Sequence, residues 1–239
     1  FFSSRRRHTR FRNVTGVQTC ALPISVLMVR QLAAGKSDEA HGLWYRQAAS
    51  MCRTVVPLTM GTALIAPEVF RLLFGTRYGG SVLPFQVFAL IGLHRVSEYG
   101  VILRSAGRTR DVATSSVVLL GSIIALGIPG VLMGGMAGLT ASTVCAHLVA
   151  WWWVLGKVAS IFGRTRQTVF PWTDWASRVL LYGAATFAVG WMASFVDGTT
   201  QRLLTKSLAM GAVVVFTEFG ATRFRESLSA TQLEGCHVR

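Results

Sequence analysis

Residues 81–103 read SVLPFQVFALIGLHRVSEYGVIL, and this stretch decides how the rest of the chain is interpreted. It is long enough to cross a bilayer, because a spanning helix needs about 20 mostly apolar residues. Its middle nevertheless carries His94, Arg95 and Glu98. An ionised side chain at that depth costs at least about 2.5–3.5 kcal/mol, so such residues are rare and face a protein interior or a water-filled cavity. We therefore predict a bundle helix with a polar cluster at mid-depth.

The three polar residues of this cluster would lie close together on an α-helix. Glu98 is four residues from His94 and three from Arg95, so one carboxylate could reach both partners. A cluster of this kind either locks neighbouring helices together or forms part of a transport path. The residues alone leave both interpretations open.

The composition of the whole chain indicates an all-α, polytopic membrane protein. Of its 239 residues, 51% are hydrophobic and 14% are charged, and the mean hydropathy is +0.47. A soluble domain carries about 25% charged residues. The apolar residues are grouped in blocks of nearly spanning length, whereas a transmembrane barrel would show alternating segments of about ten residues.

Residues 1–25 differ from the rest of the chain. They read FFSSRRRHTRFRNVTGVQTCALPIS, with five arginines and no acid, and VTGVQTCALPI resembles the translation of a sequencing adapter. We interpret this segment as an artefact of sequence assembly; the alternative, a genuine basic leader, lacks the apolar core of a secretory signal. The remainder has 19 basic and 10 acidic residues, a net charge of +9. Basic cytoplasmic loops explain that charge, and no nucleic-acid partner is needed.

Six segments of spanning length form a predicted transmembrane lobe, residues 54–221. The predicted spans are residues 54–74, 81–103, 112–133, 139–159, 175–196 and 203–219, with a tight glycine turn at 134–138. Residues 26–53 are expected to be the end of a truncated helix followed by an amphipathic connector, with Trp44 and Tyr45 near the membrane interface. Residues 222–239 are expected to be a polar cytoplasmic tail.

The basic residues predict the orientation of the spans, because cytoplasmic loops are enriched in lysine and arginine. If the first span starts in the cytoplasm, most basic side chains outside residues 1–25 fall on that side. The exceptions are Arg71, Arg77, Arg202 and Lys206. Both ends are therefore predicted to be cytoplasmic. Glu68 and Arg71, three residues apart, are expected to pair near the outer interface.

Three stretches resemble a known transporter family. They are APEVFRLLFGTRYGGSVLPFQVFAL at 66–90, LRSAGRTR at 103–110 and GMAGLTAST at 135–143. Their order and spacing are similar to the carboxyl-terminal half of the polysaccharide and oligosaccharide flippases, in the multidrug/oligosaccharidyl-lipid/polysaccharide exporter superfamily. The resemblance covers about residues 26–162 and four consecutive helices.

The resemblance implies a lobe of a two-lobed transporter of the bacterial inner membrane. Such proteins move undecaprenyl-diphosphate-linked oligosaccharides by alternating access for the synthesis of cell-surface polysaccharides such as lipopolysaccharide. The implied partners are a lipid-linked oligosaccharide, membrane lipids, polysaccharide polymerase and assembly proteins, and an amino-terminal lobe that this chain lacks. Because half a cavity cannot alternate, the chain is not expected to transport by itself.

The candidate substrate-binding residues are Arg95, Glu98, His94 and Arg104. A diphosphate needs positive charge in a low-dielectric cavity, and the planar guanidinium of arginine matches phosphate oxygens. Arg95 is the first candidate, with Glu98 holding its side chain and His94 adding a donor. The alternatives are a structural cluster, since buried charges are paired in either case, and a proton-coupling site at Glu98 or His94. Arg104 could meet anionic headgroups, or it could only set the topology.

Other chemistry finds little support in the sequence. Cys52, Cys145 and Cys236 have no CxxC spacing, which argues against a disulfide framework and a zinc site. We find no P-loop, HExxH, nucleophile elbow or paired catalytic carboxylates. We therefore expect a transporter that is not an enzyme and needs no metal or cofactor. Two alternatives remain open, namely a drug or cation exporter of the same superfamily and a membrane-embedded polysaccharide-synthesis enzyme. A non-functional reading frame created by misassembly is a further possibility.

Overall fold

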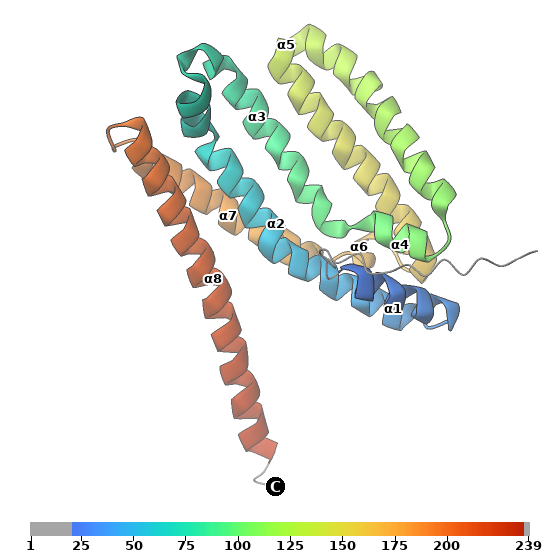
Figure 1. Ribbon diagram of the computed structural model, residues 1–239. Helices are drawn as coiled ribbons and strands as arrows, with labels where there is room; N and C mark the ends of the chain where they lie inside the picture. The colour runs from blue at the N-terminus through green and yellow to red at the C-terminus, as the bar shows by residue number, and fades with distance from the viewer. Residues whose placement is uncertain (1–20, 237–239) are drawn as a thin grey trace, which may run out of the picture.

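The computed structural model describes residues 21–236 and the side chains of residues 26–218, and this part of the chain is helical without a strand. The first 20 residues of the predicted artefactual segment lie outside the described residues. The elements, shown in Figure 1, are α1 (Ala21–Ala33), α2 (Ser37–Phe74), the 3-10 helix η1 (Thr76–Ser81), α3 (Val82–Ala89), the 3-10 helix η2 (Leu90–Ser97), α4 (Tyr99–Ser105), α5 (Thr109–Phe162), α6 (Arg166–Val169), α7 (Trp172–Ala193) and α8 (Thr199–Cys236).

Within the described chain, α2 and α5 are long and apolar enough to cross a membrane, with mean hydropathies of 1.3 and 2.3 in their most apolar windows. α5 has 54 residues but doubles back at Gly135, where φ is 56° and ψ is −137° (Figure 1). The glycine turn predicted at 134–138 is therefore confirmed. The predicted spans lie in α2, in α3 to α4, in the two arms of α5, in α7 and in α8. The predicted fold class, an all-α membrane bundle, is confirmed.

The two arms of α5 approach each other closely beside this turn. A Cβ added at Gly138 would lie 2.0 Å from the backbone oxygen of Gly130. Only glycine allows backbones to come so near, as in the small-residue contacts of membrane helices. The glycine-rich segment thus lets the chain reverse and also lets its arms pack.

The amphipathic connector and the first span form one continuous helix, α2. A stripe of buried residues repeats every fourth position along it: Ala40, Trp44, Ala48, Cys52, Val56, Met60 and Leu64. Because four residues turn an α-helix slightly more than once, this stripe winds around α2, which packs against other elements over most of its length. Trp44, expected near the membrane interface, is 1% exposed and belongs to the protein core.

The deciding stretch, residues 81–103, is not the single helix that its apolar length predicts. It is divided into α3, η2 and α4, and Glu98 between the last two has a left-handed backbone with φ 33° and ψ 41°. A left-handed conformation is strained for any residue with a Cβ. The surrounding packing must therefore stabilise the break.

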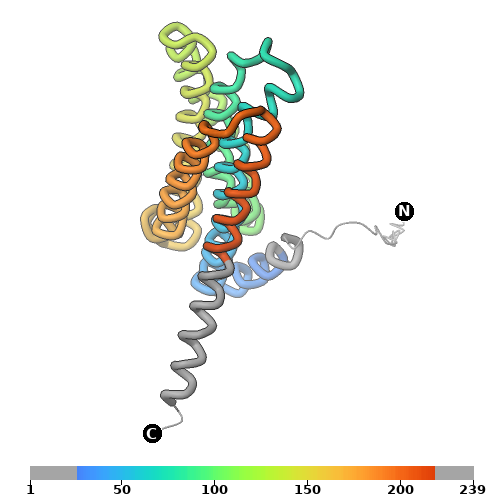
Figure 2. The backbone as a smooth tube through the Cα atoms, turned by 90° about the vertical axis from the view of Figure 1, so that its left-hand side faces the viewer, coloured from blue at the N-terminus to red at the C-terminus, as the bar shows by residue number. Residues whose placement is uncertain are grey.

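α2 lies at the centre of the bundle. It contacts α3, η2, α7 and α8, and α1 packs across its amino-terminal half (Figure 1). Turned by 90°, the bundle is elongated, and the described part of α8 descends toward the end that carries α1 (Figure 2). α8 continues to Cys236, well beyond the end predicted for the last span.

Candidate functional site

Three tryptophan side chains stabilise the break between η2 and α4. The indole N–H of Trp175 in α7 donates to the Leu93 carbonyl oxygen at 2.9 Å, and that of Trp44 in α2 donates to the Ser97 carbonyl oxygen at 2.9 Å. Trp151 in α5 donates to the Ser97 hydroxyl, also at 2.9 Å. Non-helical backbone is tolerated at membrane depth only where such partners replace the lost helical hydrogen bonds.

Close packing against α2 also fixes the position of η2. A Cβ added at Gly92 would lie 2.5 Å from the Thr59 hydroxyl oxygen of α2. The absence of a side chain at Gly92 therefore lets the two backbones approach. Discontinuous helices commonly form the substrate and ion sites of secondary transporters, which makes the break a candidate functional site.

The break separates the three residues of the predicted polar cluster. His94 is 4% exposed and faces α5, with its ring centroid 5.4 Å from that of His147. Arg95 and Glu98 are exposed, and in the described part of the chain no ion pair joins them to each other or to another side chain. The expected contact of one carboxylate with both partners is wrong, because η2 is a 3-10 helix and Glu98 leaves the helical backbone.

Arg104, the fourth predicted site residue, is exposed in α4. Its guanidinium folds back toward Gly100, where an added Cβ would lie 3.3 Å from Nη2. Arg108, by contrast, pairs with Asp111 at 2.8 Å and donates to the Ser160 hydroxyl at 2.7 Å. Arg108 thus ties the ends of the two α5 arms together, while Arg104 makes no ion pair in the described chain.

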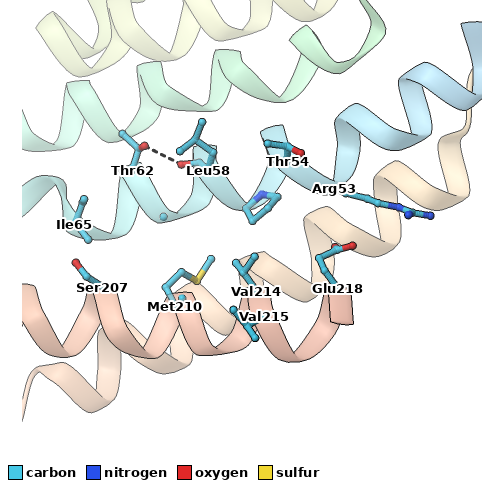
Figure 3. A pocket seen from close by; sticks show the side chains of 13 residues that line it. Arg53, Thr54, Leu58, Thr62, Ile65, Ser207, Met210, Val214, Val215 and Glu218 are labelled. Carbon is cyan, nitrogen blue, oxygen red and sulfur yellow. Dashed lines mark hydrogen bonds between the residues drawn. The ribbon is translucent and has the colours of Figure 1, made fainter. Parts of the chain in front are cut away.

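A groove that the sequence did not predict lies between α2 and α8, and we call it the α2–α8 groove. Its volume is about 770 Å³. Figure 3 shows Ile65 of α2 and Met210 and Val214 of α8 between the two helices, and Leu58 and Val215 also line the groove. The groove is therefore apolar over most of its length.

Charged residues lie near one end of this groove. Arg53 of α2 and Glu218 of α8 are found there (Figure 3). Glu218 also forms an ion pair with Arg178 of α7 and accepts a hydrogen bond from the Tyr182 hydroxyl at 3.2 Å. A groove with an apolar body and a polar end can hold an amphipathic molecule.

A buried ion pair joins α2 to α8. The Lys206 ammonium lies 2.7 Å from Oε1 of Glu68 and donates to the Leu64 carbonyl oxygen at 3.2 Å. The expected Glu68–Arg71 pair is wrong, since Arg71 is exposed whereas Glu68 is 6% exposed. The sequence held a signal for this burial, because Glu68 lies about one helical turn after the apolar Leu64 and so shares nearly the same face of α2.

The described residues offer no group of three or more histidine, cysteine, aspartate or glutamate side chains that could hold a metal ion. The free cysteines of this part are Cys52, which is buried, and Cys145, which is exposed.

Comparison with known proteins identifies a similar fold. No family model matches the chain, and no curated protein does. A solved structure of the lipid II flippase MurJ in an inward closed conformation matches with a TM-score of 0.66 at 15% sequence identity. The match covers 87% of this chain and 44% of the MurJ chain. The chain thus has the fold of part of a helical membrane transporter and spans less than half of that structure's length.

Proposed function

We propose that this chain is the carboxyl-terminal lobe of a transporter that flips a lipid-linked oligosaccharide across the bacterial inner membrane. The observation that carries the proposal is the fold similarity to a lipid II flippase over 87% of the chain. Because the match covers only 44% of that flippase, an amino-terminal lobe of the same protein would complete the transporter. The proposed lobe comprises residues 54–221, and both ends of the chain would be cytoplasmic.

The α2–α8 groove supports a lipid-linked substrate. Its apolar body, about 770 Å³ in volume, suits part of an isoprenoid tail, since burial of hydrocarbon is favourable. Arg53 at its charged end could attract a diphosphate, because guanidinium groups bind phosphate oxygens through paired hydrogen bonds. The groove would hold the tail while the sugar moves through the cavity between the lobes.

Arg95, Glu98, His94 and Arg104 remain the proposed headgroup site. Arg95 and Arg104 are exposed on the lobe and have no carboxylate partner in the described chain. If Arg95 lies at membrane depth, its charge would need water or an anion beside it. A wet cavity shared with the amino-terminal lobe would meet that need.

Filling the groove tests the role assigned to it. In proteoliposomes that contain the intact transporter, Gly211→Phe should lower the flipping rate of a fluorescent lipid-linked sugar about tenfold, which corresponds to about 1.4 kcal/mol. A Cβ at Gly211 meets no atom within 4 Å, so the ring can enter the groove without a clash. Gly121→Phe in α5 is the matched control, because that position is equally open. Equal rates for both variants would contradict the groove's role.

The same preparation tests the headgroup site and the alternative function. Arg95→Ala should abolish flipping while the protein still inserts; unchanged flipping would leave Arg95 a structural residue. A cationic-drug exporter stays the rival, since Glu98 is not neutralised by Arg95 as expected and could attract a cation. Efflux of a cationic dye that is lost in Glu98→Gln, without flipping of the lipid-linked sugar, would favour that rival.

A further inference from the structure

A small polar cavity lies beside the break, between η2, α4 and both arms of α5. Its volume is about 50 Å³, and its polar lining includes His94, Tyr99, Ser115 and His147. A buried cavity needs only about 10–15 Å³ to hold one water molecule. The cavity therefore has room for water, and it lies where two imidazole rings from different elements meet.

The hydrogen bonds of the two rings leave unfilled positions at this cavity. His94 is 4% exposed, and its Nδ1 is buried without a hydrogen-bond partner in the described chain. Most buried side-chain nitrogens have a hydrogen-bond partner, and a bound water molecule is one way to supply it. His147 donates from Nδ1 to the Thr143 carbonyl oxygen at 2.9 Å, so in the neutral ring Nε2 is the free acceptor.

We infer that this cavity is a hydrated proton-binding site formed by His94 and His147 together. Their ring centroids are 5.4 Å apart, close enough for the charge of one ring to act on the other. A proton taken up from the bulk solvent would convert one imidazole to imidazolium, and the other ring, still neutral, would stabilise it through the cavity water. Two like charges so near would repel, so the pair takes up its two protons in separate steps.

The other charged groups near the break do not line this cavity. Arg95 and Glu98 belong to the same connection but are exposed. No lysine, arginine or carboxylate is among the described lining residues. α2 and α7 pack against η2 yet contribute no lining residue. The partner of His94 is thus His147, not Glu98, and the site does not depend on the proposed transport function.

Ring titration by NMR tests this inference. The 239-residue chain, labelled at its five histidines and held in nanodiscs, gives ring signals that are followed with pH. The His94 and His147 signals should each follow the same two steps, separated by about one pH unit or more. In His147→Gln the His94 signal should follow one step, and in His94→Gln the His147 signal should do likewise.

His41→Gln is the matched control, because His41 is also buried but binds the Val169 carbonyl oxygen at 3.0 Å and lies outside this cavity. It should leave both steps in place. If either ring of the unaltered chain titrates in a single step unaffected by loss of the other, the inference is wrong. The reciprocal variant provides the same information if one of the two fails to fold. Since the rings are observed directly, loss of transport has no bearing on the result.

Discussion

The Glu68–Lys206 pair is the most demanding contact at the scale of single residues. Both side chains are buried, and the second carboxylate oxygen of Glu68 has no hydrogen-bond partner in the described chain. Desolvating two charges costs several kcal/mol per ion, so such a pair contributes little net stability. Removing one member is different, because the other is then buried without compensation.

We therefore expect Lys206→Met to lower the free energy of unfolding by about 3–5 kcal/mol. The double variant Glu68→Leu with Lys206→Met should recover most of this loss, since it removes both charges. Denaturant unfolding in detergent micelles, followed by tryptophan fluorescence, measures these differences.

Lys157→Met provides the matched control for this prediction. Lys157 lies 3.7 Å from Asp111, and its side chain is 37% exposed. An exposed pair contributes about 0–1 kcal/mol. A loss in Lys206→Met no larger than in Lys157→Met would show that Lys206 is hydrated and that the α2–α8 contact does not depend on it.

The sequence predicted charged residues at depth but not their partners. The chemistry of the cluster pointed to Glu98 as the partner of Arg95, since spacing on a helix is the only geometry that a sequence offers. The predicted Arg95–Glu98 ion pair does not form, because the helix is interrupted at Glu98. Lys206 lies 138 positions from Glu68, and such a distant partner follows from how helices pack, not from periodicity.

At the scale of elements, the broken helix depends on the closeness of η2 to α2. Gly92→Ala places a methyl group 2.5 Å from the Thr59 hydroxyl oxygen, so something must shift. Overpacking of this kind costs about 1–3 kcal/mol. We expect that loss in Gly92→Ala, measured by the same unfolding assay, and recovery of most of it in the double variant Gly92→Ala with Thr59→Ala.

Gly183→Ala in α7 is the control, because an added Cβ there meets no atom within 4 Å. Alanine favours a helix over glycine by about 1 kcal/mol, so this variant should be neutral or stabilising. If Thr59→Ala fails to rescue Gly92→Ala, the cost comes from elsewhere in η2 and the close approach to α2 is not its cause.

The apolar blocks of the sequence predicted the helices. They did not predict the break between η2 and α4. Neither a proline nor a pair of glycines stands at the break in residues 81–103. Glu98, which does stand there, is an unusual residue for a left-handed backbone. Indole donors from α2 and α7 satisfy backbone carbonyl groups at the break, and a third from α5 binds the Ser97 hydroxyl. They come from up to 82 positions away, so only the folded bundle shows why this point of the helix can open.

At the scale of the whole molecule, the order of the elements makes the chain pass back and forth along one bundle. η1 and the turn of α5 lie at one end, and α4 and α6 lie at the other (Figure 1). The exposed arginines are concentrated at the end with α4 and α6, which is the distribution expected of a cytoplasmic face. Orientation is thus a property of the assembled chain, and single helices carry too few charges to determine it.

Cysteine labelling tests this arrangement with a matched pair of variants. In a chain without its four native cysteines, Thr76→Cys in η1 and Thr109→Cys at the start of α5 place exposed thiols at opposite ends of the α3–α4 segment. A membrane-impermeant maleimide should label Thr76→Cys in intact cells and Thr109→Cys only after the membrane is opened. The reverse labelling pattern would show that the α3–α4 segment crosses the membrane in the orientation opposite to the predicted one. Labelling of both thiols from one side would mean that the broken helix does not span the membrane, because its two ends would then share one face.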